Sequence, residues 1–461
     1  MTDDETAAQE TTGVSASTST STDRRAFLAT GAAVGATAAS GCLLMPTGGS
    51  TGSAAAGGNS TNGNVTAGGS PSLNVDRWRS EFGTVINMAE AGADPTGERD
   101  VTPVIQDKIA SDTLLYFPSG RYKMNSQVRR VSLRDVGILG ENATLVHGSV
   151  TEIKGFDVYG GEFTGPAQHF KIGVPESPHE GKFLFGGFTL DWRAKNAGMQ
   201  VLNHHTSGTS EVRGLRQVGM HSLGCQGPLR LHPATEDATI RARDLDFRFG
   251  GKTFQKTIND RDTRSLGGPR DRSLSTTGIA GHPQMQGRLR VENAQVGGWP
   301  DNGIYAIGGQ PGEGDGTVEV VNCVTANSHP SNIRIGGDNS RIHKCGIVTD
   351  QSFDEDYYFE QRPIRLDDGT CSVTDTKIVQ KVPTGWSITV QTGVEKARLR
   401  NIDVTIQGTP TMALVIDEGA GDVRVQNVSI RTPGWNASEA AVIRNGGATL
   451  QGVTLNGTKI A

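Results

Sequence analysis

Charged side chains of types that suit acid–base chemistry gather between residues 301 and 368. The candidate catalytic residues are Asp301, Arg334, Asp338, Arg365 and Asp367. Two carboxylates can share the general acid and base roles in glycoside hydrolysis. The alternative is β-elimination on a uronate, in which a guanidinium neutralises the substrate carboxylate because its planar fork matches that group. The residue types leave both reactions open, and a polysaccharide is the partner in both.

Polar and aromatic residues around this set are candidates for holding a substrate. They are Arg230, His282, Asn302, Tyr305, Asn332 and Asp368. Each also has a structural interpretation. A carboxylate can be a turn residue or an ion-pair partner, an asparagine can stack in a ladder, and an aromatic ring can pack against a loop.

Metal ligation receives no support from the sequence, because no cluster of histidine, cysteine and acidic residues has a spacing typical of metal ligands. The sequence therefore predicts no metal site, and the adjacent His204 and His205 are expected at the surface. The cofactor stays open, with Ca²⁺ as the candidate if the reaction is elimination.

A short apolar–variable–apolar phrase recurs through the same part of the chain and must position these residues. Its late copies are Ile304-Tyr305-Ala306, Ile333-Arg334-Ile335, Ile364-Arg365-Leu366, Ile388-Thr389-Val390, Leu414-Val415-Ile416 and Ala441-Val442-Ile443. The first residues are spaced by 29, 31, 24, 26 and 27 positions. A two-residue period predicts a strand. Recurrence every ~25 residues predicts stacked similar units.

The middle residue of each copy is expected to point away from the core. Earlier copies extend the series, so that the predicted outward line is Gln200, Arg230, Ala280, Tyr305, Arg334, Arg365, Thr389, Val415 and Val442. This line is polar and cationic from Arg230 to Arg365 and neutral afterwards. Strands in neighbouring units lie ~4.8 Å apart, which suits two-carboxylate chemistry, although Asp301 and Asp367 are not an obvious pair along the strands.

One segment interrupts the regular spacing. Residues 250–277 are charged and irregular, within a step of 50 residues between the copies at Leu229 and Ile279. Long irregular loops in compact proteins are usually functional or disordered. We expect this insertion to project beside Arg230, His232 and His282.

Bulk composition excludes some classes of protein. The chain has 461 residues, a net charge of −5, 62 glycines and only 5% aromatic residues. A mild negative charge does not favour nucleic-acid binding, and no apolar run is long enough to span a membrane. Cys323, Cys345 and Cys371 are expected to stack on adjacent units, as buried free thiols or with one disulfide.

The N-terminal residues resemble an export signal. Arg24 and Arg25 precede a mildly apolar run that ends in Ala39-Ser40-Gly41-Cys42. Paired arginines of this kind resemble a twin-arginine signal, and small residues before a cysteine resemble a lipobox. The resemblance implies export, lipidation of Cys42, and a membrane contact through that lipid anchor only. The predicted organisation is a signal at 1–42, a Gly/Ser/Thr tether at 43–72 and a folded domain at 73–461.

The start of the folded domain resembles a known superfamily. The stretches GADPTGERDVTPVIQDKI and LLYFPSGRYKM, between residues 92 and 124, are similar to the opening of pectate-lyase-like right-handed parallel β-helix proteins. The resemblance implies an all-β solenoid with a short N-terminal capping helix, expected from Thr102-Pro103 through Ala110. The resemblance indicates little about the reaction, because the polygalacturonase motifs are absent as a set. We therefore expect either a polysaccharide lyase or hydrolase, or a non-catalytic module that binds glycan or cell-wall polymer; the oligomeric state stays open.

Overall fold

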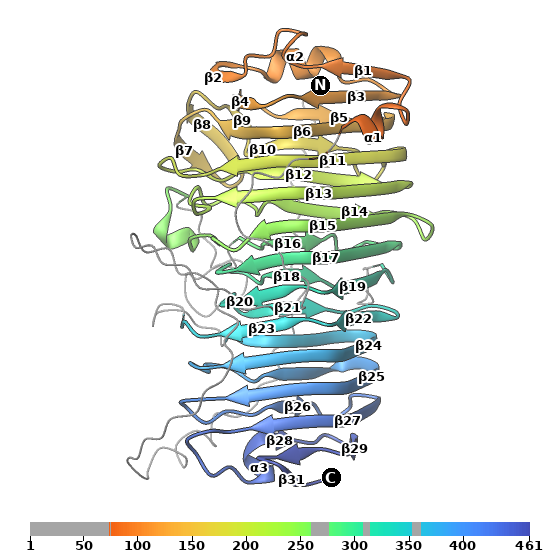
Figure 1. Cartoon of the computed structure of the whole chain (residues 1–461), viewed down its shortest axis with the longest axis vertical. Coiled ribbons are helices and arrows are strands. Elements are labelled where there is room, and N and C mark those ends of the chain that lie inside the picture. Colours follow the sequence, from red (N-terminus) through yellow and green to blue (C-terminus); the bar gives the residue numbers. More distant parts are fainter. Residues whose placement is uncertain (1–72, 74, 260–275, 308–313, 353–360) are drawn as a thin grey trace, which may run out of the picture. The chain divides into compact units, whose positions relative to one another are not determined.

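The computed structural model describes residues 73, 75–259, 276–307, 314–352 and 361–461. The signal, the tether, Arg24, Arg25, Cys42 and most of the predicted insertion lie outside them. Short strands stack side by side in coil after coil (Figure 1), and all but a few pair in parallel. The prediction of an all-β parallel β-helix is confirmed. No helix within the described residues is long and apolar enough to cross a membrane.

Three parallel sheets run along the stack, one strand of each per coil. The first sheet carries the recurring phrase and we call it the first ladder. Its strands are β5 (Val128–Arg130), β10 (Gln168–Ile172), β12 (Gln200–Thr206), β14 (Leu229–Pro233), β16 (Ile279–Gly281), β18 (Ile304–Ala306), β21 (Ser331–Ile335), the starts of β24 (Arg362–Gln380) and β25 (Ile388–Ile406), β26 (Leu414–Ile416) and β28 (Ile443–Arg444).

The second and third sheets share several long, bent strands. The second contains β1 (Thr84–Asn87), β3 (Thr113–Phe117), β6 (Arg134–His147), β11 (Glu180–Asp191), β13 (Thr209–Val218), β15 (Thr239–Phe247), β17 (Arg288–Gly297), β19 (Thr317–Val321), β22 (Ser340–His343), β27 (Asp422–Arg431) and β29 (Thr449–Gln451), with parts of β24 and β25. The third contains β2 (Thr96–Asp100), β4 (Gly120–Met124), β20 (Val324–Ala326), β23 (Gly346–Thr349) and β30 (Thr454–Leu455), with the ends of the long strands.

A single left-handed residue bends the chain between the second and third sheets. Six of these residues, with φ between 52° and 56°, are Asp244, Asn293, Asn322, Asp375, Asn401 and Asn427. Asparagine and aspartate tolerate this conformation better than other non-glycine residues. Their side chains also bond from coil to coil, as Asn322 Nδ2 donates to Asn293 Oδ1 at 2.7 Å. The ladder of asparagines therefore lies at this bend.

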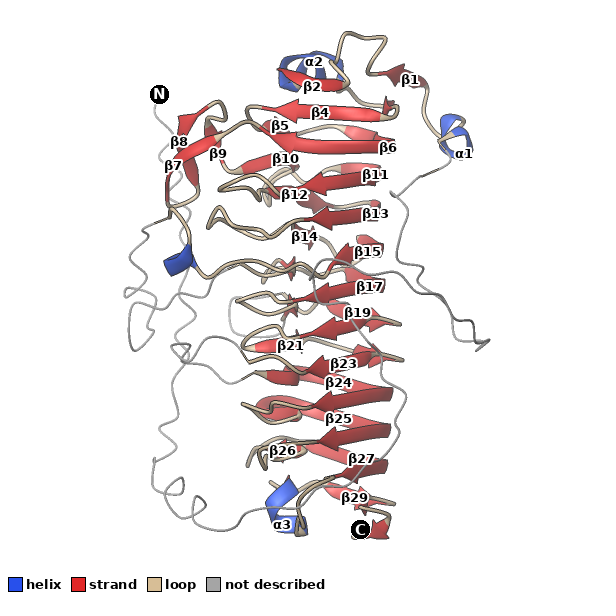
Figure 2. Cartoon of the chain, turned by 60° about the vertical axis from the view of Figure 1, so that its left-hand side comes forward, coloured by secondary structure: helices blue, strands red, loops and turns tan. Residues whose placement is uncertain are grey.

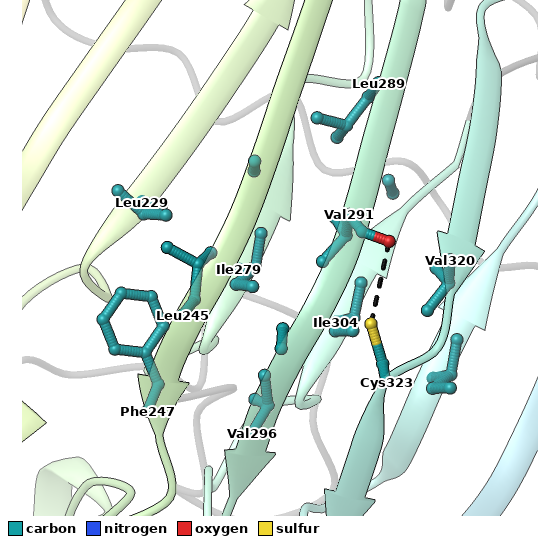
Figure 3. Close-up of a cluster of buried hydrophobic side chains, with 14 of the residues drawn as sticks. Leu229, Leu245, Phe247, Ile279, Leu289, Val291, Val296, Ile304, Val320 and Cys323 are labelled. Carbon is teal, nitrogen blue, oxygen red and sulfur yellow. Dashed lines mark hydrogen bonds between the residues drawn. The ribbon is translucent and has the colours of Figure 1, made fainter. Parts of the chain in front are cut away.

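Apolar side chains from all three sheets fill the interior continuously. Figure 3 shows one section, in which Leu229, Ile279 and Ile304 from the first ladder meet Leu289 and Val296 of β17. The stacked aliphatic rows predicted from the two-residue period form this core. Each coil is too thin to bury its apolar face alone, so neighbouring coils stabilise one another.

The N-terminal end of the stack is covered as predicted. Helix α2 (Thr102–Lys108) lies over the first coils in Figures 1 and 2, and its Ile105 is completely buried in the core. Thr102 is the first residue of the helix, whereas its cap is Val101. The side chain of Asp100 instead accepts from the Thr102 backbone N–H at 2.9 Å.

The remaining elements are small. They are α1 (Asp76–Arg79), α3 (Glu439–Val442), a 3₁₀ turn at Phe254–Lys256, β31 (Thr458–Lys459) antiparallel to β30, and a separate antiparallel sheet of β7 (Val150–Lys154), β8 (Asp157–Gly161) and β9 (Gly165–Pro166). The small sheet was not predicted. It packs Val150, Val158 and Phe163 in a core of its own.

The four described cysteines are free and buried. Cys323 and Cys345 precede β20 and β23, which pair directly, so they occupy equivalent positions on neighbouring coils. Cys371 pairs with Ser340 and lies elsewhere. The expectation of free thiols is confirmed, and the expected column of three is wrong.

Candidate functional site

The outward side of the first ladder, here called the outer face, carries most of the candidate residues. Residues at the centre of each strand point outward in register. From β12 to β28 they are Asn203, Arg230, Ala280, Tyr305, Arg334, Arg365, Thr389, Val415 and Arg444. The predicted cationic line from Arg230 to Arg365 is therefore present.

The two ends of the predicted line are wrong. Asn203 pairs with Arg230. The outward residue of β12 is therefore Asn203, three residues after the predicted Gln200. Arg444 pairs with Val415, whereas Val442 is completely buried at the end of α3. The last residue of the outward line is therefore a cation, Arg444, which donates to Asp417 at 2.9 Å. A short apolar run can pair with its neighbour in more than one register, so the sequence alone does not determine the strand register at the ends of the series.

Four residues of the outer face form one connected group, which we call the arginine–aspartate cluster: Tyr305, Arg334, Arg365 and Asp367. The carboxylate of Asp367 accepts from Arg334 Nε through one oxygen and from Arg365 Nε at 2.5 Å through the other. The Arg334 guanidinium lies 4.7 Å from the centre of the Tyr305 ring. The three strands β18, β21 and β24 supply these groups from consecutive coils.

The cluster keeps its charges despite burial. Burial raises the pKa of the Asp367 carboxyl, but the positive charges of Arg334 and Arg365 outweigh that effect, and the net pKa is lowered. Burial lowers the pKa of the Arg334 guanidinium, yet the charge of Asp367 leaves it raised. Arg334 is therefore permanently protonated and cannot act as a base.

Asp301 lies beside the cluster but in a different electrostatic state. Its carboxylate accepts from Thr277 Oγ1 at 2.7 Å and from Asn302 Nδ2 at 2.8 Å. Burial raises its pKa to about 6, against the opposing hydrogen bond of Thr277 and the charge of Arg334. A buried carboxyl with a raised pKa near a charged partner is a common feature of functional sites.

The other candidates separate into two groups. Asn302 and Asn332 are completely buried, and Asn332 Oδ1 accepts from the Ser328 backbone N–H at 3.1 Å, so neither side chain is exposed at the surface. Asp338 is exposed and Asp368 is half-buried, both in the bends that follow the first ladder. Neither joins the arginine–aspartate cluster.

Two residues further along each strand, the outer face carries three histidines that we call the histidine cluster: His205, His232 and His282. His205 pairs with His232 across β12 and β14. His282 follows Gly281, the residue paired with Leu231. The expectation that His204 and His205 lie at the surface is wrong, because both are buried, at 0% and 3% exposure. Spacings of 27 and 50 residues gave no local metal signal, and only the register of the strands reveals the group.

The three imidazoles are uncharged at neutral pH. Burial is the main cause, and it lowers the pKa of His232 to about 4 and that of His282 to about 2. Burial also lowers the pKa of His205. The half-buried Arg230, two residues before His232, adds a positive charge that lowers all three further.

A hollow of about 680 Å³ lies away from this face. It is next to the bend after β11, and Arg193, Lys195, Lys252 and Lys256 line part of it. Arg193 is paired with Asp191 at 2.7 Å. The hollow is thus basic, but it does not contain the predicted site residues.

The described ends of the predicted insertion attach at two places. Thr277 donates to the Asp301 carboxylate at one end, and Gly251 bridges to His221 at the other. Both ends precede β16, whereas His282 follows that strand. The expectation that the insertion projects beside Arg230 and His282 concerns residues 260–275, which lie outside the described residues.

Comparisons with known proteins add little to this geometry. No protein-family model and no curated protein sequence matches the chain. Similar solved structures include ORF18 of Geobacillus virus E2 (TM-score 0.44, 11% identity, 80% of this chain and 60% of that one) and the surface protein and adhesin PfbA of Streptococcus pneumoniae (0.42, 12%, 80% and 97%). The catalytic unit of a GH87 α-1,3-glucanase from Streptomyces thermodiastaticus is also similar (0.32, 13%, 80% and 68%). The chain thus spans less than two thirds of the length of ORF18, and likenesses at these scores identify no family and no activity.

Proposed function

We propose that this chain is a polysaccharide-binding β-helix protein that holds an acidic glycan against the arginine–aspartate cluster. The observation that carries the proposal is the fixed placement of an aromatic ring and two guanidiniums on three consecutive coils, with Asp367 joining both arginines. Two cations and one anion leave the cluster with a net positive charge. A row of side chains that repeats every ~4.8 Å suits a ligand that also repeats.

A binding assay with matched variants tests this role. The chain is titrated with a panel of polyuronates and neutral glycans, and Tyr305→Ala and Arg365→Ala are compared with Arg424→Ala. Arg424 is 55% exposed and lies on β27, outside the first ladder. We expect each cluster variant to bind at least about 10-fold more weakly, which corresponds to about 1.4 kcal/mol. Unchanged binding in both cluster variants would overturn the proposal.

Hydrolysis is a second candidate, and one specific observation favours it. The pKa of Asp301 is raised to about 6 while that of Asp367 is lowered. Two carboxyl groups whose pKa values are pushed apart are typical of an acid and base pair. Asp301 would be the general acid. Against this role for the pair, both oxygens of Asp367 are already engaged by arginine, so that it has no free oxygen to activate water. This is why binding is the leading proposal.

Product analysis separates the candidates. New reducing ends that disappear in Asp301→Asn, with glycan binding retained, would establish hydrolysis. New ultraviolet absorbance from a C=C bond would indicate elimination, and its loss with a chelator would identify the Ca²⁺ requirement. Elimination with Arg334 as the base is disfavoured, because the pKa of this residue is raised. Binding with no product of either kind supports a non-catalytic module.

We also propose that the protein is exported through the twin-arginine pathway and anchored to the membrane by lipid on Cys42. The support is the sequence alone: Arg24-Arg25, the mild apolar run, and small residues before Cys42. Cell fractionation tests it. Replacing Arg24 and Arg25 by lysine should retain the protein inside the cell, and Cys42→Ala should release it from the membrane. Membrane association unchanged by Cys42→Ala would remove the anchor from the proposal.

A further inference from the structure

The histidine cluster takes no part in the proposed glycan contact, and its geometry calls for a separate explanation. His205 and His232 are 3% exposed, and one ring nitrogen from each of the three histidines lies within 4.8 Å of the others. The residues come from consecutive coils, so the strand register fixes their approach. Three imidazoles in one place are costly to bury unless their nitrogens find partners.

The rings are held in contact with one another. His232 and His282 are stacked, with 4.1 Å between ring centres and 17° between planes. His205 meets His232 edge-on at 5.0 Å. His205 Nδ1 lies 2.8 Å from His232 Nδ1, a distance that without an ion requires a proton on one of the two nitrogens.

A second set of contacts orients the rings. His232 Nε2 lies 3.2 Å from the Gln284 carbonyl oxygen, which can only accept, so Nε2 carries the proton and Nδ1 presents its lone pair to His205. A backbone carbonyl that fixes the tautomer in this way is typical of a metal-binding histidine. His282 Nδ1 accepts from the Gln284 backbone N–H at 3.2 Å. Gln284 thus contacts two of the three rings, through its carbonyl oxygen and its N–H.

The surrounding charges are mixed. Arg230 is a cation on the same strand as His232, and the exposed Glu176 on the neighbouring turn acts on His232 with the opposite sign. A dication at the cluster would therefore meet one positive and one negative side chain besides three neutral imidazoles. Neutral imidazole is the form that binds metal.

We propose that His205, His232 and His282 form a binding site for one divalent transition-metal ion, which links three consecutive coils. Imidazole nitrogen suits Zn²⁺, Cu²⁺ and Ni²⁺, whereas Ca²⁺ and Mg²⁺ prefer oxygen. Three histidines around Zn²⁺ leave a fourth position for water or another ligand, and the side of His282 is the more exposed. Tetrahedral coordination at ~2.0–2.1 Å from each nitrogen would require His205 and His232 to separate slightly from their present contact, and coordination through His205 Nδ1 would require its proton to move to Nε2 of the same ring.

Metal titration of the full chain, purified without a polyhistidine tag, tests the site. The chain contains ten histidines, and we expect one Zn²⁺ per chain after dialysis. Co²⁺ should give the visible absorption of a tetrahedral nitrogen site, and Zn²⁺ should remove it. His282→Gln is the first variant, because its greater exposure makes misfolding a smaller risk than at His232. His343→Gln on β22, far from the cluster in the chain, is the matched control.

The expected loss is large. Removal of an outer-shell partner usually weakens metal binding about 10–100-fold, so loss of His282 or His232 should exceed that range, while His343→Gln should leave the affinity unchanged. Zn²⁺ should also raise the midpoint of thermal unfolding in the wild type, because a ligand of the folded state stabilises it, and not in His282→Gln. No tetrahedral Co²⁺ spectrum, or equal Zn²⁺ affinity in wild type and both cluster variants, would overturn the site. Glycan binding is tested separately with Tyr305→Ala, so that the metal site and the glycan contact can each be rejected without the other.

Discussion

The outer face carries two polar clusters a few coils apart, and they differ in how they satisfy their own atoms. In the arginine–aspartate cluster, both oxygens of Asp367 accept from guanidiniums, and Arg334 stacks on Tyr305. In the histidine cluster, His205 and His232 face each other with two nitrogens that can share only one proton. The first group is joined by contacts between opposite charges and keeps a net positive charge, whereas the second brings together neutral nitrogen ligands with no opposite charge among them.

This difference shows why burial alone does not identify a binding site. Asp367 and Arg334 keep their charges despite burial because each has an opposite charge in contact. Burial itself keeps the histidines neutral by lowering their pKa values, and the positive charge of Arg230 adds to that effect. A site for a cation is therefore expected where neutral imidazole nitrogens converge, and a rigid, positively charged contact surface is expected where one carboxylate holds two guanidiniums.

The largest effect is expected from breaking the arginine–aspartate cluster. Asp367→Ala leaves two guanidiniums, 14% and 21% exposed, without their shared carboxylate, and the loss of one partner from a buried ion pair costs about 3–5 kcal/mol, of which we expect the lower part for these partly exposed arginines. The free energy of unfolding in urea measures it. Asp338→Ala, an exposed carboxylate in a neighbouring bend, should cost less than about 0.5 kcal/mol. Equal effects of the two changes would show that Asp367 does not hold the cluster together.

The histidine cluster should make the fold sensitive to acid in the absence of metal. The pKa of His232 is lowered to about 4, so between that value and the unfolded pKa of ~6.5 the unfolded chain binds a proton that the folded chain does not. Stability is therefore lost as the pH falls. Between pH 7.5 and pH 5 we expect His232 to account for about 2 kcal/mol of that loss. The pKa of the half-buried His343 is lowered as well, so His232→Gln should flatten the profile more than His343→Gln does; equal flattening by the two changes would contradict the assigned protonation state.

Asp301 should respond with the opposite sign. Its pKa is raised to about 6, so the folded chain takes up the proton first, and its contribution to stability is lost as the pH rises through 6. From pH 7.5 to pH 5 the carboxyl should add about 1 kcal/mol. The pH dependence of the free energy of unfolding in Asp301→Asn, compared with that in Asp338→Asn, measures the contribution of the Asp301 carboxyl. A profile that matches the wild type in Asp301→Asn would indicate that the carboxyl is not buried in solution.

The fold could be predicted because its signals are local and repeated. Strand phrases such as Ile333–Ile335 and Ile364–Leu366 pair in the predicted register, since two-residue periodicity and similar spacing both constrain the stack. The predictions failed where the phrase is least distinctive, at Met199–Val201 and Ala441–Ile443. There, apolar runs allow several registers, and only neighbouring coils decide among them.

The sequence predicted the positions of several candidate residues better than it predicted their contacts. Arg334, Arg365 and Asp367 were named from their positions, and the structure joins them. The sequence could not show that Asp301 belongs to another environment, because this depends on Thr277, on the preceding coil. His205 and His232 were missed as partners because a contact across 27 residues depends on strand register and not on local spacing.

The smallest expected effect tests whether the arginine–aspartate cluster also works as a binding surface. Tyr305→Leu keeps an apolar side chain but removes the ring under Arg334, which lies 4.7 Å from its centre. A cation–π contact at a partly exposed site is worth about 0.5–1 kcal/mol, so the free energy of unfolding should fall by no more than that amount, whereas glycan binding should fall about 10-fold because the leucine offers no ring. Tyr159→Leu is the matched control, since Tyr159 is 61% exposed on the small sheet and outside the cluster. A loss of stability with unchanged glycan binding would assign Tyr305 to packing alone, and the arginine–aspartate cluster would then be a structural clamp, distinct from any site where the protein meets its ligand.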